Sequence, residues 1–201
     1  MKQIARTVGS QSHVVRIIGG QWKRTRLAVA DQPGLRPTPD RVRETLFNWL
    51  GQDLTGWHCV DAFAGTGALG LEAASRGATE VLLVERDDRL VAQLRRTQAQ
   101  LQAGATRIVR GDGVAALRQL APASMHLVFL DPPFDSDLYQ SALRAARAAL
   151  ATDGFIYLEA PVRWTDEQLR ALGFVLYRYL KAGAVHAHLL RPGAAALVGT
   201  A

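Results

Sequence analysis

From residue 57 onward, short apolar runs alternate with longer segments whose apolar positions recur at helical spacing. The apolar runs have the length of buried strands and lie at residues 58–63, 80–85, 106–112, 126–131 and 154–160. The segments between them predict helices at residues 68–76, 89–102, 114–120 and 138–150. Strands that are apolar on both faces and alternate with helices indicate a parallel sheet covered by helices on each side.

The end of the chain has a different pattern. Residues 174–191, FVLYRYLKAGAVHAHLLR, form two alternating strands around KAG, and so short a link requires them to be antiparallel. Just before them, Thr165 and Gln168 have the spacing of a capping box at the start of a helix at residues 165–172. The expected fold class is therefore α/β: a doubly wound, Rossmann-like sheet of seven strands, mostly parallel, with a C-terminal antiparallel hairpin.

The first 50 residues are expected to form a small extension, a hairpin and a helix, before a main domain at residues 51–201. The stretch VVRIIGGQWKRTRLAV predicts two short strands around Gly19-Gly20. After a loop, Thr38 has the position of a helix N-cap, with Pro39 at the first helical position. The helix that follows has one apolar face and two arginines off it. The apolar residues are Val42, Leu46, Trp49 and Leu50, and the arginines are Arg41 and Arg43.

Basic residues are concentrated in this extension. The whole chain has a net charge of +6, and residues 1–50 hold nine Lys or Arg against three Asp or Glu, so they carry all of it. A local excess of positive charge is typical of proteins that bind a polyanion, most often nucleic acid. A solvated basic arm without a partner would have the same composition. The candidate contacts to nucleic-acid phosphates are Lys23, Arg24, Arg26, Arg36, Arg41 and Arg43.

Several classes of protein and site are disfavoured by the sequence. No apolar run approaches the roughly 20 residues needed to span a bilayer, and MKQIARTVGSQSHVV lacks the apolar core of a signal peptide. Cys59 is the one cysteine, so no internal disulfide can form. His186 and His188 alternate on one strand without a third metal ligand nearby in the sequence. We expect a cytoplasmic protein without a metal.

The stretch DAFAGTGALGLEAASRGA, residues 61–78, contains the spacing Gly65-x-Gly67-x-x-Gly70. It follows a predicted strand and opens a helix, which is the context in which this spacing binds a nucleotide. Glu85 lies 20 residues beyond Gly65, at the end of the next strand, where an acid can hold ribose hydroxyls. We therefore expect a nucleoside-containing cofactor at the carboxyl end of the first strand.

The glycine loop alone does not choose between a nicotinamide dinucleotide and S-adenosyl-L-methionine. Asp61 stands four residues before the first glycine with Phe63 between them, and DxFxGxG resembles the first motif of class I methyltransferases. Asp112, in the sequence GDG, ends the third strand, where it can accept a hydrogen bond from an adenine amino group or form a plain Asx turn. The cofactor-binding candidates from these motifs are Asp61, Phe63, Gly65, Gly67, Glu85, Asp112 and Gly113.

The stretch FLDPPFDS, residues 129–136, ends the fourth strand with an aspartate and two prolines. In a doubly wound sheet this strand lies beside the first, so the stretch faces the glycine loop across the crevice where such folds bind ligands. An exocyclic amine of a base is a poor nucleophile because its lone pair is delocalised into the ring. The Asp131 carboxylate and the Pro132 carbonyl offer two acceptors for the amine hydrogens, and the prolines fix both in place. Phe134 can stack on the base, so these three residues are the catalytic candidates.

Together these motifs resemble the amino-group methyltransferases with a (D/N)PP(F/Y/W) motif, and more narrowly the RsmD family of bacterial 16S ribosomal RNA guanine-N2 methyltransferases. RIIGGQWKRTRL, RPTPDRVRETLFNWL, DAFAGTGALGLEAASRGA and LDPPF stand in the family's order, and the resemblance covers about residues 14–191. It implies S-adenosyl-L-methionine as cofactor and 16S ribosomal RNA, in the 30S subunit or a late assembly intermediate, as substrate. It also implies that the segment Arg36–Thr38, and with it Thr38, lines the site near the methionine end or the substrate mouth.

Three other functions remain open from the sequence. A DNA or RNA adenine-N6 methyltransferase carries the same Asp-Pro-Pro-Phe motif, although the chain has no separate target-recognition domain. A nicotinamide-dependent oxidoreductase carries the same glycine spacing. A non-catalytic RNA-binding module would have the methyltransferase fold without catalysing methyl transfer. A monomer is the default expectation for the oligomeric state.

Overall fold

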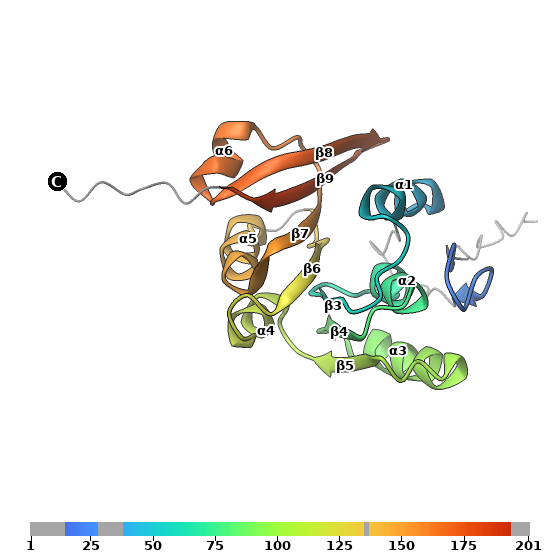
Figure 1. Ribbon diagram of the computed structural model, residues 1–201. Helices are drawn as coiled ribbons and strands as arrows, with labels where there is room; N and C mark the ends of the chain where they lie inside the picture. The colour runs from blue at the N-terminus through green and yellow to red at the C-terminus, as the bar shows by residue number, and fades with distance from the viewer. Residues whose placement is uncertain (1–14, 28–37, 135–136, 194–201) are drawn as a thin grey trace, which may run out of the picture.

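The computed structural model describes residues 15–27, 38–134 and 137–193 (Figure 1). Seven strands form one sheet in the order β5-β4-β3-β6-β7-β9-β8. The strands from β5 to β7 run parallel, and β9 lies antiparallel between β7 and β8. The strands are β3 (His58–Asp61), β4 (Glu80–Glu85), β5 (Thr106–Arg110), β6 (Met125–Leu130), β7 (Leu150–Ala160), β8 (Phe174–Ala182) and β9 (Val185–Pro192). This arrangement confirms the predicted doubly wound sheet and its C-terminal hairpin.

Helices cover both faces of the sheet. Figure 1 shows α1, α2 and α3 on one side and α4, α5 and α6 on the other. The helices are α1 (Asp40–Leu50), α2 (Ala68–Ser75), α3 (Asp88–Leu101), α4 (Gly113–Gln119), α5 (Leu138–Ala149) and α6 (Asp166–Ala171). Helices on both faces require the central strands to be apolar on both faces, as their sequences are.

The two hydrophobic cores follow from the pleat of the strands. In β4, Leu83 packs into a core with Phe47 of α1, whereas Leu82 and Val84 face the opposite core with Leu143 of α5. Successive side chains of a strand point to opposite faces, so one apolar run fills both cores. The first core also contains Val15, Ile17 and Leu27 from the N-terminal extension.

The start of β7 differs from the prediction. The strand begins at Leu150, directly after α5, and not at Gly154. Met125 pairs with Leu150 while Leu127 pairs with Phe155, so extra residues of β7 bulge out opposite β6. The polar residues in this bulge resemble a loop in the sequence.

The predicted capping box is confirmed at the start of α6. The Thr165 hydroxyl accepts a hydrogen bond from the Gln168 amide, and the Gln168 side chain accepts one from the Thr165 amide.

The N-terminal hairpin is also shorter than predicted. Its strands, β1 (Val15–Arg16) and β2 (Arg26–Leu27), have two residues each and are antiparallel. Beyond the strands, the pairing continues only to Ile17, whose amide donates to the carbonyl of Thr25 and whose carbonyl accepts from the amide of Arg24. The next amides, from Ile18 to Trp22, donate mainly to α2. Gln21 donates to the carbonyl of Ser75, and a Cβ on Gly20 would lie 1.8 Å from that same carbonyl oxygen. Lys23 and Arg24 therefore lie in a turn, and not on a second strand as expected.

A buried ion network holds this segment against the sheet domain. Glu72 of α2 is completely buried and accepts hydrogen bonds from the amides of Ile18 and Gly19 at 2.7 and 2.8 Å. It also pairs with Arg43 of α1 at 3.3 Å and with Arg76 at 2.8 Å. A buried carboxylate needs such partners, since burying an unpaired charge is costly. The network ties the hairpin and α1 to the helix that follows the glycine loop.

The predicted position of Arg43 is therefore wrong. Its side chain is fully buried and also bonds to Asp40 and to the carbonyls of Arg16 and Thr38. Burial lowers its pKa, and the carboxylates of Glu72 and Asp40 raise it. The sequence pattern placed Arg43 on the polar face of α1 because an arginine with buried partners cannot be told from an exposed one by periodicity. A guanidinium enclosed in this way cannot reach an RNA phosphate.

Candidate functional site

The site lies where the strand order reverses. β3 lies between β4 and β6 in the sheet. The helix that follows β4, α3, covers one face of the sheet, and the helix that follows β6, α5, covers the other. Doubly wound sheets bind ligands at the carboxyl ends of the strands at such a switch point. Three carboxylic side chains gather there: Asp61 ends β3, Asp131 follows β6, and Glu159 lies near the end of the neighbouring β7.

The glycine loop connects β3 to α2 and includes two residues in the left-handed region of backbone conformation. Gly65 and Gly67 have φ angles of 52° and 80°, which favour glycine, and Gly67 is the N-cap of α2. The amide of Gly65 donates to Glu85 at 2.8 Å. The other oxygen of Glu85 accepts hydrogen bonds from the amides of Arg86 and Asp87. Glu85 thus fixes both the glycine loop and the turn into α3, and the structure brings the predicted cofactor residues of β3 and β4 together.

Asp61 is the buried acid of this loop. One of its oxygens, Oδ2, accepts a hydrogen bond from the amide of Gly70 at 3.0 Å. The other, Oδ1, is buried, and no described residue hydrogen bonds to it. Burial raises the pKa of Asp61 to about 7, with the carboxylates of Glu85 and Glu159 adding to the increase and backbone amides opposing it. A buried, unpartnered carboxylate oxygen fits the cationic group of a ligand.

Asp112 and Gly113 lie beside this loop, and each has a local structural role. Asp112 is the N-cap of α4, where its Oδ1 accepts a hydrogen bond from the Ala115 amide at 2.8 Å. A Cβ on Gly113 would lie 2.0 Å from the carbonyl oxygen of Ala62 and 3.3 Å from the ring of Phe63. Glycine is therefore required for α4 to approach the end of β3. Phe63 is partly buried and packs against the core under α4 and α5.

The Asp-Pro-Pro-Phe stretch follows β6 directly. Pro132 is buried, and Phe134 is one of the few large hydrophobic side chains that the described residues expose, at 37%. Burial raises the pKa of Asp131 well above its ordinary value, and the carboxylates of Glu159 and Asp61 raise it further. The effect of Asp61 on the pKa of Asp131 agrees with the predicted proximity of Asp131 to the glycine loop. An exposed aromatic ring beside a carboxyl group can stack on a base.

Glu159 is a site residue that the sequence did not assign. It is 2% exposed, and its Oε1 accepts hydrogen bonds from the hydroxyls of Thr38 at 2.6 Å and Tyr157 at 2.8 Å. Burial raises its pKa, whereas these two hydroxyls and the charge of Arg43 lower it. The sequence did hold a signal for this role: Glu159 stands at the end of an apolar strand, and that strand is the neighbour of the one that ends at Asp-Pro-Pro-Phe.

Thr38 reaches the site by a route that differs from the predicted one. The N-cap of α1 is Pro39, without a side-chain capping bond, so the predicted capping role of Thr38 is wrong. Its hydroxyl points instead to Glu159, 121 residues away along the chain. Arg36, the other end of the segment expected to line the site, lies outside the described residues.

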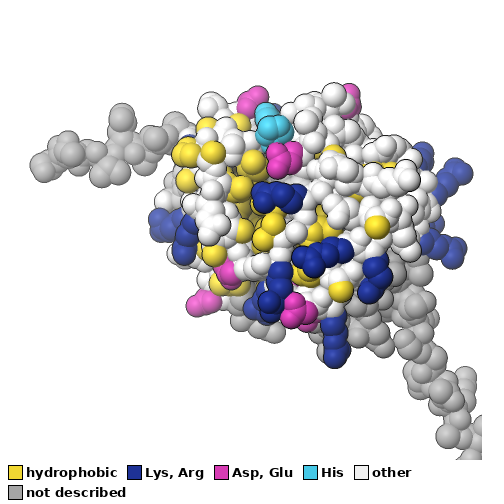
Figure 2. Space-filling model, turned by 90° about the horizontal axis from the view of Figure 1, so that it is seen from below, with side chains coloured by type: hydrophobic (Ala, Val, Ile, Leu, Met, Phe, Trp, Pro, Cys, Tyr) yellow, Lys and Arg dark blue, Asp and Glu magenta, His cyan; other side chains and the backbone are white. Residues whose placement is uncertain are grey.

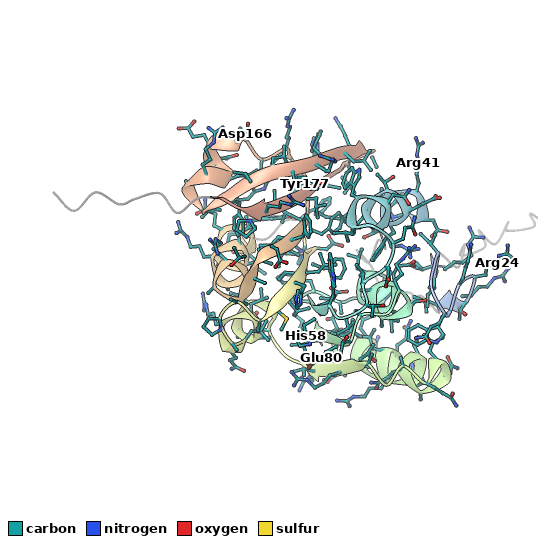
Figure 3. The ribbon with its side chains drawn as sticks, viewed as in Figure 1. Arg24, Arg41, His58, Glu80, Asp166 and Tyr177 are labelled. Carbon is teal, nitrogen blue, oxygen red and sulfur yellow. The ribbon has the colours of Figure 1, made fainter. Side chains whose placement is uncertain are left out.

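The remaining basic candidates are on the surface. Lys23, Arg24, Arg26 and Arg41 are exposed. Figure 3 shows Arg24 on the N-terminal hairpin and Arg41 on α1, both directed away from the sheet. Figure 2 shows Lys and Arg side chains scattered over one face, with acidic and hydrophobic side chains between them, and no single continuous basic patch.

Two absences apply to the described part of the chain. In residues 15–27, 38–134 and 137–193, no helix is long and apolar enough to cross a membrane. The same residues include no group of three or more His, Cys, Asp or Glu side chains placed to hold a metal ion.

The strand order, the glycine loop and the Asp-Pro-Pro-Phe stretch at the switch point define the class I methyltransferase fold. A solved structure of the Escherichia coli protein yhhF, described as a candidate methyltransferase, superimposes with a TM-score of 0.77 at 40% identity, over 90% of this chain and 99% of that one. The chain belongs to the family described as conserved hypothetical protein 95, which matches residues 15–191.

Several relatives of this chain carry the name ribosomal RNA small subunit methyltransferase D. The protein from Escherichia coli K12 is 42% identical over 180 residues, which cover 84% of this chain and 90% of the relative. The protein from Haemophilus influenzae is 37% identical over 177 residues, which cover 82% of this chain and 92% of the relative. The resemblance to the RsmD family, drawn from four motifs, is confirmed.

Proposed function

We propose that this protein transfers a methyl group from S-adenosyl-L-methionine to the exocyclic N2 amine of a guanine in 16S ribosomal RNA. The observation that carries the proposal is the placement of Asp131, Pro132 and Phe134 beside the glycine loop at the switch point of the sheet. The names of the relatives from Escherichia coli and Haemophilus influenzae support an RNA of the small ribosomal subunit as the substrate.

The residues around the glycine loop fit the proposed cofactor. The unpartnered Oδ1 of Asp61 suits the α-ammonium group of the methionine moiety, and Gly65 and Gly67 allow the backbone to approach the ligand closely. Glu85 would accept hydrogen bonds from the ribose hydroxyls, and Asp112 would accept one from the adenine amino group through lone pairs that the capping bond does not use. Bound there, the cofactor supplies an electrophilic methyl group. Phe63, Gly113 and Thr38 complete the proposed surroundings of the cofactor.

The Asp-Pro-Pro-Phe stretch would prepare the amine for attack. The carboxylate of Asp131 and the carbonyl of Pro132 accept the two amine hydrogens and direct the nitrogen lone pair toward the methyl group. As the nitrogen becomes positive, the carboxylate stabilises the developing charge. Phe134 stacks on the base, which must leave its own stack to enter the site.

The N-terminal extension, residues 1–50, would bind RNA, and residues 51–201 would catalyse methyl transfer. The exposed cations Lys23, Arg24, Arg26 and Arg41 would contact phosphates, as would Arg36, and such contacts add affinity without reading the sequence. We place the substrate in the 30S subunit or a late assembly intermediate, and the protein in the cytoplasm as a monomer.

The test is transfer of labelled methyl from S-adenosyl-L-methionine to unmodified 30S subunits, followed by digestion of the RNA to nucleosides. Label in N2-methylguanosine supports the proposal. Label in N6-methyladenosine would keep the chemistry and replace the base, and no label in any nucleoside would contradict the reaction itself. The matched variant Asp131→Asn should lower transfer by about 10²–10³-fold while cofactor binding, measured by calorimetry, changes little.

A further inference from the structure

Asp131 and Glu159 form a carboxyl pair on adjacent strands. Leu130 of β6 pairs with Leu158 of β7, so the next residue of each strand, Asp131 and Glu159, continues that register. Neighbouring strands are about 4.8 Å apart, so two carboxyl groups at this position share one environment. Burial and mutual repulsion disfavour the state in which both are ionised.

The hydrogen bonds distinguish the two members of the pair. Glu159 accepts hydrogen bonds from the Thr38 and Tyr157 hydroxyls, and the buried guanidinium of Arg43 adds a positive charge nearby. Asp131 has no hydrogen-bond donor among the described residues. Donors and a cation favour the ionised form of a carboxyl group, so the surroundings favour the negative charge on Glu159 and the proton on Asp131.

We infer that Glu159 is a positioning residue: Thr38 and Tyr157 hold it as the charged member of the pair, which makes Asp131 the group that takes the proton lost by the methylated amine. The inference rests on the proposed function. It also gives a reason for the 2.6 Å hydrogen bond from Thr38, which otherwise links the segment before α1 to β7 without a chemical consequence.

The nitrogen–carbon bond forms from the nitrogen lone pair as the carbon–sulfur bond breaks, and the electrons of that bond stay on sulfur. The nitrogen, now positive, regains a lone pair when one N–H proton passes to the Asp131 carboxylate. Asp131 returns this proton to water when the methylated base leaves the site. Glu159 remains ionised throughout and raises the proton affinity of Asp131.

The charged and titratable groups that face Asp131 set the direction of the test. Glu159 and Tyr157 lie on β7 and Asp61 lies on β3, and Arg43 of α1 acts on Glu159 and Tyr157. The carboxylate of Glu159 raises the pKa of Asp131, so removing that charge must lower it. Methyl transfer requires ionised Asp131, so the acid limb of the rate profile must then move to lower pH.

The decisive experiment compares the pH dependence of kcat for methyl transfer to 30S subunits in the wild type and in Glu159→Gln. Glutamine keeps an oxygen for both hydroxyls and removes the charge. We expect the acid limb to move down by about one pH unit. Thr38→Val should also move it down, because Glu159 without its donor takes the shared proton, and Thr38→Ser should restore the wild-type position.

A second measurement does not depend on the RNA or on the cofactor. In protein labelled with ¹³C at aspartate carboxyl groups, the Asp131 signal is identified by its loss in Asp131→Asn, and its titration midpoint should fall in Glu159→Gln. A midpoint and an acid limb that stay in place, or that move up, would overturn the inference. Wild-type protein that transfers no methyl group while the midpoint still falls would contradict the proposed function and leave the pairing intact.

Discussion

Asp61 combines a buried carboxyl group with an oxygen that no described residue binds. Its pKa is raised to about 7, chiefly by burial. A raised pKa means that the folded protein holds this proton more tightly than the unfolded chain does. The resulting stabilisation is complete below about pH 4 and is lost as the pH rises through 7. As the pH rises through 7, the buried carboxyl group of Asp61 ionises without a cationic partner, which lowers the stability of the free protein. A cationic group of a ligand would compensate for this loss.

This gives a prediction for cofactor binding. The ionised form of Asp61 is the one that pairs with an ammonium group, so the affinity for S-adenosylhomocysteine should rise by about tenfold between pH 6 and pH 8. Calorimetry at several pH values measures it. In Asp61→Asn the affinity should be weaker and nearly independent of pH over this range. A wild-type affinity that is flat, or that falls as the pH rises, would separate Asp61 from the ligand.

At the scale of elements, the contact between β3 and α4 depends on one missing side chain. A Cβ on Gly113 would lie 2.0 Å from the backbone oxygen of Ala62, a distance that requires one of the two elements to shift. Ala62 opens the glycine loop, so Gly113→Ala should weaken S-adenosylhomocysteine binding by at least about tenfold, in addition to destabilising the fold by ~1–3 kcal/mol. Calorimetry and thermal unfolding measure the two effects.

The chain offers a matched control for that substitution. A Cβ on Gly104 would meet nothing within 4 Å. Gly104→Ala should therefore leave both the melting temperature and the affinity close to those of the wild type. If both alanine variants bound the ligand equally well, the close approach of α4 to β3 would have no bearing on the site.

The N-terminal hairpin, α1 and α2 are joined by Glu72, which gives a second prediction at this scale. Glu72→Ala leaves Arg43 buried with one carboxylate fewer and the amides of Ile18 and Gly19 without their acceptor. Removing one partner from a buried ion pair costs about 3–5 kcal/mol, so unfolding in urea should show a large loss of stability. Hydrogen exchange at Ile18 and Gly19 should accelerate more than exchange in β3–β7.

A comparison with a surface pair separates this effect from a general loss of charge. Glu80 and Arg107 lie 4.0 Å apart with both side chains more than half exposed. Such pairs contribute little, so Glu80→Ala should unfold at nearly the wild-type urea concentration. Equal losses of stability in the two variants would show that the buried network is not what holds the extension.

At the scale of the whole molecule, the basic side chains that the structure describes in the N-terminal extension are exposed except that of Arg43. Replacing Arg24 and Arg41 by Ala should weaken binding to the 30S subunit and reduce the salt dependence of the affinity, with the slope falling by about one per lost phosphate contact. Filter binding at several salt concentrations measures it. Arg118→Ala, an exposed arginine on α4, is the control and should leave the slope unchanged.

Much of this organisation was accessible from the sequence because it rests on local patterns. Apolar runs and helical spacing predicted the sheet, its helices and the C-terminal hairpin, since these periodicities reflect which faces are buried. The spacing of Gly65, Gly67 and Glu85, and the stop of a strand at Asp131, marked the ends of β3, β4 and β6. In a doubly wound sheet those ends meet at one edge, so the location of the candidate site followed from the order of the motifs.

The tertiary structure alone decided which charged residues are buried and which partners they have. Arg43 has a polar neighbourhood in the sequence, yet it lies in the core because Glu72 and Asp40 fold around it. The bond between Thr38 and Glu159 joins residues 121 positions apart, and no local pattern encodes it. Periodicity reports the burial of apolar groups, whereas a buried charge depends on partners that only the folded chain brings together.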